Sequence, residues 1–277
     1  MPSDTYIGRD LPLKLPDGKT MAVWLCPNVE SFALDKSVPG GSGHPYDLSP
    51  WSIREYGNRA GIWRIAKLLE DLHLIPTVAL NSDICKLHPE IIEHGDSQDW
   101  EWMGHGVTNS DFSHGLDEKA EQEQIATSLD VISQHTRMRP TGWLTPHFAQ
   151  NRITPHLLKE QGVEYVADWM VDDRVCSLNF DEGMLVILPY SLEVNDKSCY
   201  QGWKMTPKEY ADHVCTTFDQ LHRESLDSPV TFVLPMHTYL SGYPGRIQAT
   251  RAILEHILSF KESWFATGSQ IVDSIEA

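Results

Sequence analysis

Two pairs of polar side chains in this sequence are spaced so that each pair can act together. Asn28 and Glu30 lie two residues apart, a spacing that points both side chains to one face of a strand. His105 and Asn109 lie four residues apart, which places both on one face of a helical turn. Carboxylate and imidazole groups are the common carriers of protons in enzymes. The two pairs are therefore the first candidates for a chemical site.

Arg139 and His237 add a cation and a second imidazole. Arg139 opens the segment 139–143, and His237 follows the apolar stretch 230–234. A histidine at the carboxyl end of a strand is well placed for proton transfer, and a purely structural histidine is the alternative. Glu30 stands beside an apolar valine, so its carboxylate needs a partner, which is a metal, Arg139 or a substrate. We expect one site to collect all of these groups.

A regular alternation of predicted strands and helices positions these side chains. Seven or eight β/α units with right-handed crossovers form either a closed barrel or a doubly wound open sheet, and periodicity does not separate the two. In both architectures the carboxyl ends of the strands carry the chemistry. The predicted strands are residues 21–25, 75–80, 100–103, 142–144, 164–167, 184–188, 230–234 and 264–267, and the predicted helices are residues 61–72, 89–94, 117–135, 154–161, 207–223 and 246–261.

The composition favours one α/β domain. We expect a single catalytic domain over residues 1–277, with an extended segment at 1–20 and a long loop at 34–58 near the site. A net charge of −17 disfavours nucleic acid and anionic membranes as partners. The N-terminal residues lack a signal pattern and no run of 18 apolar residues occurs, which predicts a cytoplasmic protein. Five scattered cysteines indicate neither a disulfide framework nor a zinc knuckle.

In their order, these segments resemble the polysaccharide deacetylase superfamily over roughly residues 20–270. The resemblance implies an α/β fold of that type, a distorted (β/α)7 barrel. It places Asn28 at the family's catalytic base, and Glu30, His105 and Asn109 at its metal ligands. Of these four positions, only His105 keeps the family's residue type. An asparagine cannot take a proton, so the usual base is absent.

The altered positions are most similar to the allantoinase-like and cyclic-imide-hydrolase branch, which also has Asn-x-Glu in the first segment and lacks the second histidine. The resemblance implies that Arg139 orients groups at the reaction centre and that His237 is the general acid. The residues expected to bind substrate are Trp143, Asp168, Trp169, Asp172, Tyr190 and Asn195.

The resemblance implies hydrolysis of a carbon–nitrogen bond other than a peptide bond. A divalent metal such as zinc on Glu30, His105 and Asn109 is either weakly bound or absent, because a neutral amide is a poor ligand. Without it, Glu30 acts as general base with a pKa raised by burial, and Arg139 faces the oxyanion. His237 protonates the leaving nitrogen in both versions.

We expect the substrate to be a small cyclic amide, ureide or imide, held between aromatic side chains. The first alternative is an N-deacetylase of an amino sugar or polysaccharide, and the second is a non-catalytic ligand-binding protein on the same fold. No nucleotide cofactor and no membrane partner are expected. The resemblance also implies a homo-oligomer.

Overall fold

Seven parallel strands form the centre of the computed structural model, which describes residues 6–39, 41–180 and 183–276. Their order across the sheet is β9, β2, β3, β4, β5, β6, β8, and each neighbouring pair is parallel. Their carboxyl ends therefore lie along one edge. The strands are β2 (Met21–Val29), β3 (Thr77–Leu80), β4 (Glu101–Gly104), β5 (Gly142–Trp143), β6 (Tyr165–Val166), β8 (Gly183–Ile187) and β9 (Val230–His237).

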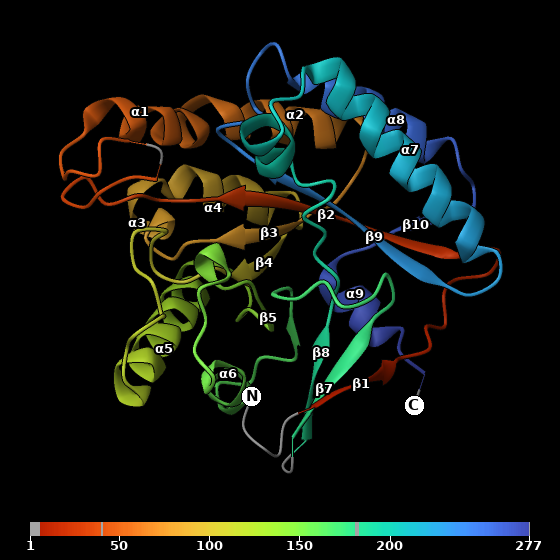
Figure 1. Ribbon diagram of the computed structural model, residues 1–277, viewed down its shortest axis with the longest axis horizontal. Coiled ribbons are helices and arrows are strands. Elements are labelled where there is room, and N and C mark those ends of the chain that lie inside the picture. The colour runs from red at the N-terminus through yellow and green to blue at the C-terminus, as the bar shows by residue number, and fades with distance from the viewer. Residues whose placement is uncertain (1–5, 40, 181–182, 277) are drawn as a thin grey trace.

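Helices follow the strands along the chain and cover the outside of the curved sheet (Figure 1). The longest, α7, begins at Thr206, whose hydroxyl accepts from the backbone N–H of Glu209 while the Glu209 carboxylate accepts in return, a capping box. The helices are α1 (Leu48–Tyr56), η1 (Gly57–Gly61), α2 (Ile62–Asp71), α3 (Ile84–Leu87), α4 (Pro89–Ser97), α5 (Glu118–His135), η2 (Pro146–Phe148), α6 (Thr154–Glu160), η3 (Ser198–Gly202), α7 (Pro207–Ser225), α8 (Ile247–Leu258) and α9 (Gly268–Asp273).

The strand β2 is buried along its whole length and joins the two main parts of the core. On one face, Met21 and Val23 pack with apolar residues of α7 and α8. On the other face, Ala22 and Trp24 pack with residues of the neighbouring strands inside the barrel. The alternation of side chains along a strand gives both contacts to one segment, and this double burial fixes the position of the site residues that follow it.

The barrel is distorted at the seam between β8 and β9. In the described part of the chain no ladder joins these strands, and the seam is bridged where the backbone N–H of Thr231 donates to the carbonyl of Asp173 over 2.9 Å. Three further strands extend the sheet: β1 (Tyr6–Asp10) and β7 (Cys176–Phe180) are antiparallel additions beyond β8, and β10 (Ser263–Phe265) pairs with the start of β2.

Two predicted segments differ from the structure in detail. The stretch 34–58 is not one loop, because α1 occupies residues 48–56, and none of the stretch lines the cavity described below. The segment 1–20 lies partly outside the described residues and contains β1 in its described part. Among the described residues, no helix has the length and apolar character needed to cross a membrane.

Candidate functional site

A cavity of about 500 Å³ opens at the carboxyl ends of the parallel strands. It collects side chains that follow β2, β4, β5 and β9, together with residues from the segment that leads into η3. This is the edge of the sheet where the sequence predicts the site. The lining residues are Asn28, Glu30, His105, Asn109, Leu144, Thr145, His147, Phe148, Tyr190, Leu192, Asn195, Lys197, Ser198, Gln201, Gly202 and His237.

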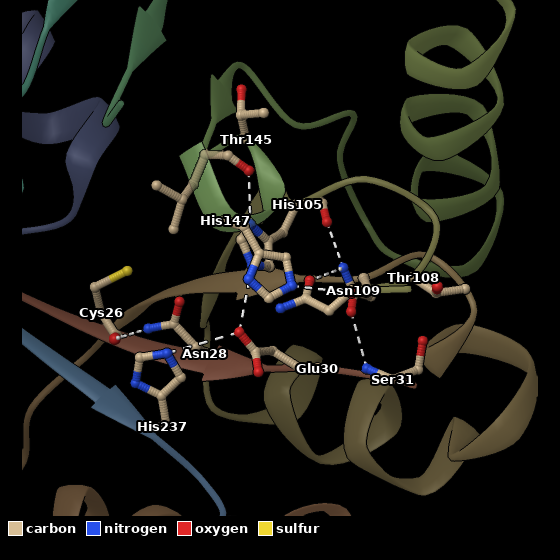
Figure 2. Close-up of polar contacts among 12 residues, drawn as sticks. Cys26, Asn28, Glu30, Ser31, His105, Thr108, Asn109, Thr145, His147 and His237 are labelled. Atoms are coloured by element: carbon tan, nitrogen blue, oxygen red, sulfur yellow. Dashed lines mark hydrogen bonds and ion pairs between the residues drawn. The ribbon is translucent and has the colours of Figure 1, made fainter. Parts of the chain in front are cut away.

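Glu30 lines this cavity and lies between the imidazoles of His105 and His237 (Figure 2). Its Oε1 atom is 3.6 Å from Nε2 of His105 and 3.6 Å from Nε2 of His237. The residue is 3% exposed, and its Oε2 atom is buried without a hydrogen-bond partner. Buried carboxylate oxygens are normally satisfied, so Oε2 is an acceptor for which the described residues supply no donor.

The electrostatic surroundings hold the Glu30 carboxyl in its ionised form. Burial acts to raise its pKa, but the charge of His237, the contact with His105 and the ammonium group of Lys197 together place the pKa well below its usual range. The expectation that burial makes Glu30 a base with a raised pKa is therefore wrong, because its interactions with the two imidazoles and the Lys197 ammonium group outweigh the loss of solvent. Glu30 is a persistent carboxylate and a weak base.

His105 is oriented by the strand beside it. Its Nδ1 atom lies 2.6 Å from the carbonyl oxygen of Leu144, to which it donates, so Nε2 of the neutral ring carries the lone pair. That Nε2 atom is buried, has no hydrogen-bond partner and faces Glu30. The arrangement presents one imidazole nitrogen and one carboxylate to the same point.

His237 forms a buried pair with Asp196. The Nδ1 atom of His237 donates to Asp196 Oδ1 over 2.7 Å, and the backbone N–H of the same histidine donates to Asp196 Oδ2 over 2.8 Å. The hydroxyl of Ser241 also donates to Oδ2, and Asp196 is fully buried. These bonds fix the imidazole with Nε2 turned towards Glu30 and the cavity.

Asn109 lines the cavity and belongs to an amide network. Its Oδ1 atom accepts from Nδ2 of Asn81 over 3.1 Å, and its backbone N–H donates to the carbonyl of Ser31 over 2.9 Å. Asn81 also donates to the carbonyl of His105 and accepts from the backbone N–H of Ser31. The network ties the segments after β2, β3 and β4 together, so the side chain of Asn109 already has a structural role.

The expected metal ligands do not form a complete set. Oε1 of Glu30 lies 3.6 Å from Nε2 of His105, but the amide oxygen of Asn109 is engaged by Asn81. Within residues 6–39, 41–180 and 183–276, no three His, Cys, Asp or Glu side chains are arranged to hold a metal ion. Two protein donors and a neutral amide do not fit the three-ligand pattern of catalytic zinc. We therefore derive no chemical step through a metal.

Asn28, Tyr190 and Asn195 line the cavity together, as the sequence indicates. Asn28 donates from Nδ2 to the hydroxyl oxygen of Tyr190 and to the carbonyl of Cys26, each over 3.0 Å. Asn195 accepts the backbone N–H of Lys197 over 2.9 Å. Asn28 therefore connects β2 to the Tyr190 side of the cavity.

Arg139 does not reach this cavity, contrary to the expectation that it faces the reaction centre. Its side chain is partly exposed, pairs with Asp130 and lines a separate cavity beside Glu101. The physical reason is its place in the chain: Arg139 precedes β5, so it lies at the amino end of that strand, opposite the site. No step at the site can be assigned to this guanidinium.

Four of the expected substrate-binding residues also lie outside the cavity lining. Asp168 accepts from the backbone N–H of Thr145 over 2.6 Å and from its hydroxyl over 2.7 Å, and Trp143 donates to the same hydroxyl over 3.1 Å. These two support Thr145, which does line the cavity. Trp169 packs against apolar residues of the core, and Asp172 accepts the backbone N–H of Arg174 in a turn.

Sequence reasoning missed two functional candidates, Asp196 and Lys197, whereas the position of His147 after Thr145 and Pro146 already indicates a residue near the site. Asp196 stands next to Asn195 in a segment that the resemblance singles out, but only the structure shows its bond to His237. His147 adopts a left-handed backbone conformation, with φ of 55°, and donates from Nε2 to the carbonyl of Asn109. Burial lowers its pKa. Lys197 lines the cavity two residues after Asn195, and no sequence pattern distinguishes it from surface lysines.

Comparison with known proteins supports the predicted fold and resemblance. No protein-family model matches the chain. A curated protein of Schizosaccharomyces pombe, named "Putative polysaccharide deacetylase", is 27% identical over 245 residues, which cover 82% of this chain and 76% of that protein.

Two solved structures extend the comparison. The crystal structure of Puue allantoinase has a TM-score of 0.85 at 23% identity and covers 94% of this chain and 91% of its own. A "putative polysaccharide deacetylase" from Mycobacterium smegmatis has a TM-score of 0.86 at 25% identity, with 98% and 95% covered. The distorted (β/α)7 barrel is thereby confirmed. So is the resemblance to the polysaccharide deacetylases, and the likeness to the allantoinase is one of fold.

Proposed function

We propose that this chain hydrolyses a carbon–nitrogen bond of a small cyclic amide, ureide or imide, with His237 as the group that moves the proton. The chain is similar to proteins named as putative polysaccharide deacetylases, and the removal of an N-acetyl group also hydrolyses a carbon–nitrogen bond. The observation that carries the proposal is the buried Asp196–His237 pair, whose free Nε2 atom faces the cavity 3.6 Å from Glu30.

His237 can serve both halves of the reaction. In the first half, water adds to the carbonyl carbon while Nε2 of His237 takes a proton from that water. In the second half, the carbon–nitrogen bond breaks and Nε2 returns the proton to the leaving nitrogen. Asp196 holds the ring through Nδ1, which keeps Nε2 aimed at the reacting atoms and stabilises the charged imidazole while it carries the proton.

Glu30 binds and orients instead of taking the proton. Its pKa lies well below the usual range, so it remains a carboxylate and its free Oε2 atom accepts hydrogen bonds. The N–H group of a cyclic ureide or imide, or the attacking water, supplies the matching donor. The role fits a carboxylate that is buried between two imidazoles and has no protein donor of its own on Oε2.

The size and walls of the cavity favour a compact ring. A volume of about 500 Å³ lies in the range of small-molecule sites, and Leu144, Phe148, Tyr190 and Leu192 supply its apolar walls. The curated relative's name supports a second candidate, N-deacetylation of an amino sugar. Both candidates use the same proton transfer by His237.

A substrate panel with a matched variant tests the proposal. We expect ring opening of hydantoins, succinimides or lactams by the wild-type protein, measured by chromatography of the acid product, and loss of that activity in Asp196→Asn. Turnover of N-acetyl sugars alone would select the second candidate. Prior treatment with a chelator should leave the rate unchanged. A rate that falls on chelation and returns with zinc would contradict the metal-free mechanism. If no compound is turned over, the alternative of a non-catalytic ligand-binding protein is favoured.

A further inference from the structure

Lys197 supplies a positive charge to the cavity. Among the lining residues in the described part of the chain, it is the one lysine or arginine. Its backbone N–H donates to Asn195 Oδ1, and the helical turn η3 begins at the next residue, so its position is fixed by local structure. Arg139, the cation that the sequence indicates, lies at the other end of the barrel.

The ammonium group of Lys197 has no anionic partner in direct contact. Across residues 6–39, 41–180 and 183–276, its Nζ atom forms no hydrogen bond and no ion pair, whereas Lys36, Lys67 and Lys208 each pair with an aspartate. Its charge still reaches the cavity, because it contributes to the lowered pKa of Glu30. A cation held beside a cavity without a counter-ion is available to a ligand.

The charges in the cavity describe the ligand that fits it. Glu30, at the strand ends, offers a free acceptor atom, and Lys197, at the start of η3, offers up to three donors and a positive charge. The whole chain carries a net charge of −17, which repels anions at long range. An anionic ligand therefore requires a local cation to be accepted, whereas a neutral one does not.

We propose that Lys197 selects substrates that carry a carboxylate in addition to the amide that is cleaved. This inference rests on the proposed function, since it names the class of ring substrate for the same cavity. The scissile amide lies against Glu30 and His237, and the carboxylate of the substrate binds the Lys197 ammonium. Lys197 is thus a specificity-determining residue, and its contribution depends on the charge of the substrate.

A matched pair of substrates separates charge from size. Hydantoin-5-acetate carries a carboxylate where hydantoin-5-acetamide carries a neutral amide of similar volume. For the wild type, we expect kcat/KM to be about tenfold or more higher for the acetate, which is the value of one charge-assisted contact. In Lys197→Met this ratio should fall to about one, mainly through a higher KM for the acetate. Lys197→Arg should keep most of the ratio.

The control is Lys208→Met, which removes an exposed lysine paired with Asp212 on α7 and should leave the ratio at its wild-type value. If Lys197→Met lowers kcat/KM for both compounds by the same factor, Lys197 stabilises the oxyanion instead and the inference is overturned. If neither compound is opened, the proposed function fails for this pair. The role of Lys197 is then tested separately, by measuring the binding of the two compounds by calorimetry. Tighter binding of the acetate that disappears in Lys197→Met supports the inference, and equal binding overturns it.

Discussion

Two glutamates at opposite ends of the barrel, Glu30 buried and Glu101 half-buried, differ in how their carboxylates are satisfied. Glu101 begins β4 at the amino end, and its oxygens accept from the hydroxyl of Thr77 over 2.7 Å, the hydroxyl of Tyr165 over 2.9 Å and the backbone N–H of Ser269 over 3.1 Å. Glu30 follows β2 at the carboxyl end, and its Oε2 atom has no partner. The two residues have the same side chain in the same fold.

The difference separates stability from function. At Glu101 the protein supplies the donors itself, so the carboxylate links β3, β4, β6 and α9. At Glu30 the remaining acceptor is left for a ligand, at a cost that folding must offset. A barrel fold typically keeps its stabilising contacts at the amino end and its chemistry at the carboxyl end. The following predictions test this division.

The largest effect is expected at His237. Replacing it with alanine should lower kcat by about 10² to 10⁴, because general acid–base groups contribute in that range. Thermal unfolding followed by circular dichroism should show a folded protein. Activity close to that of the wild type would remove His237 from the mechanism and with it the function assigned to the carboxyl end.

Glu30→Gln should lower kcat by about 10² to 10³, the range typical of removing one electrostatic contact from an active site. The change keeps the size of the side chain and removes the charge that faces the two imidazoles. Steady-state kinetics with the best ring substrate provide the measurement. Full retention of kcat would mean that the free acceptor atom has no part in the reaction.

Asp168 should make stability fall as the pH rises. Burial raises its pKa from its usual 3.8 to about 6, despite the bonds from Thr145 that act against the shift. The folded protein therefore binds this proton more tightly than the unfolded chain, so its stabilising effect is present below about pH 4 and is lost as the pH rises to about 6. Asp168→Asn removes this titrating group. In urea unfolding, the free energy of unfolding of the variant minus that of the wild type should therefore rise by about 3 kcal/mol between about pH 4 and about pH 6. A difference that does not change with pH would contradict the raised pKa.

Glu101→Gln should lower stability and leave activity nearly unchanged, whereas Glu30→Gln should lower activity. The amide presents an N–H₂ group to neighbours that donate hydrogen bonds, so we expect unfolding in urea to cost about 2 kcal/mol less than in the wild type. The kcat should stay within about twofold of the wild-type value, since Glu101 is distant from the site. Loss of kcat without loss of stability would place chemistry at the amino end.

The smallest effect is expected at Arg139. Arg139→Gln removes an exposed ion pair with Asp130, and such pairs contribute at most about 1 kcal/mol. Urea unfolding and kcat should both remain close to those of the wild type. A drop in kcat of tenfold or more would show that this guanidinium reaches the site in solution and would restore the role first expected of it.

The order of strands and helices was predictable because it depends on patterns that repeat, whereas the barrel was implied by the family resemblance. The strand and helix periods are visible in the sequence, and the residues that end β2, β4 and β9 project into one cavity because parallel strands share a carboxyl edge. Glu30, His105 and His237 are brought together for this reason. Arg139 has the residue type that the family resemblance expects. It stands before β5 in the chain, however, and therefore lies at the amino end of the barrel.

The remaining site residues depend on contacts that the sequence does not encode locally. Asp196 reaches His237 across a seam of the barrel, 41 positions away in the chain. The pKa of Glu30 is lowered because two imidazoles and an ammonium group from three different segments surround it, and residue type alone indicates burial and hence the opposite shift. Lys197 is informative because it lacks a partner, which only a three-dimensional arrangement can show.

The long ladder between β2 and β9 has a consequence for how the protein is made. Asn28 on β2 lies directly opposite His237 on β9, although β9 is synthesised about 200 residues later. Until then the fully buried strand β2 has one edge without its partner, which is the condition under which chains associate wrongly. The ribosome therefore delivers Glu30 early and His237 late, and premature termination before β9 yields a chain that lacks the proposed proton carrier.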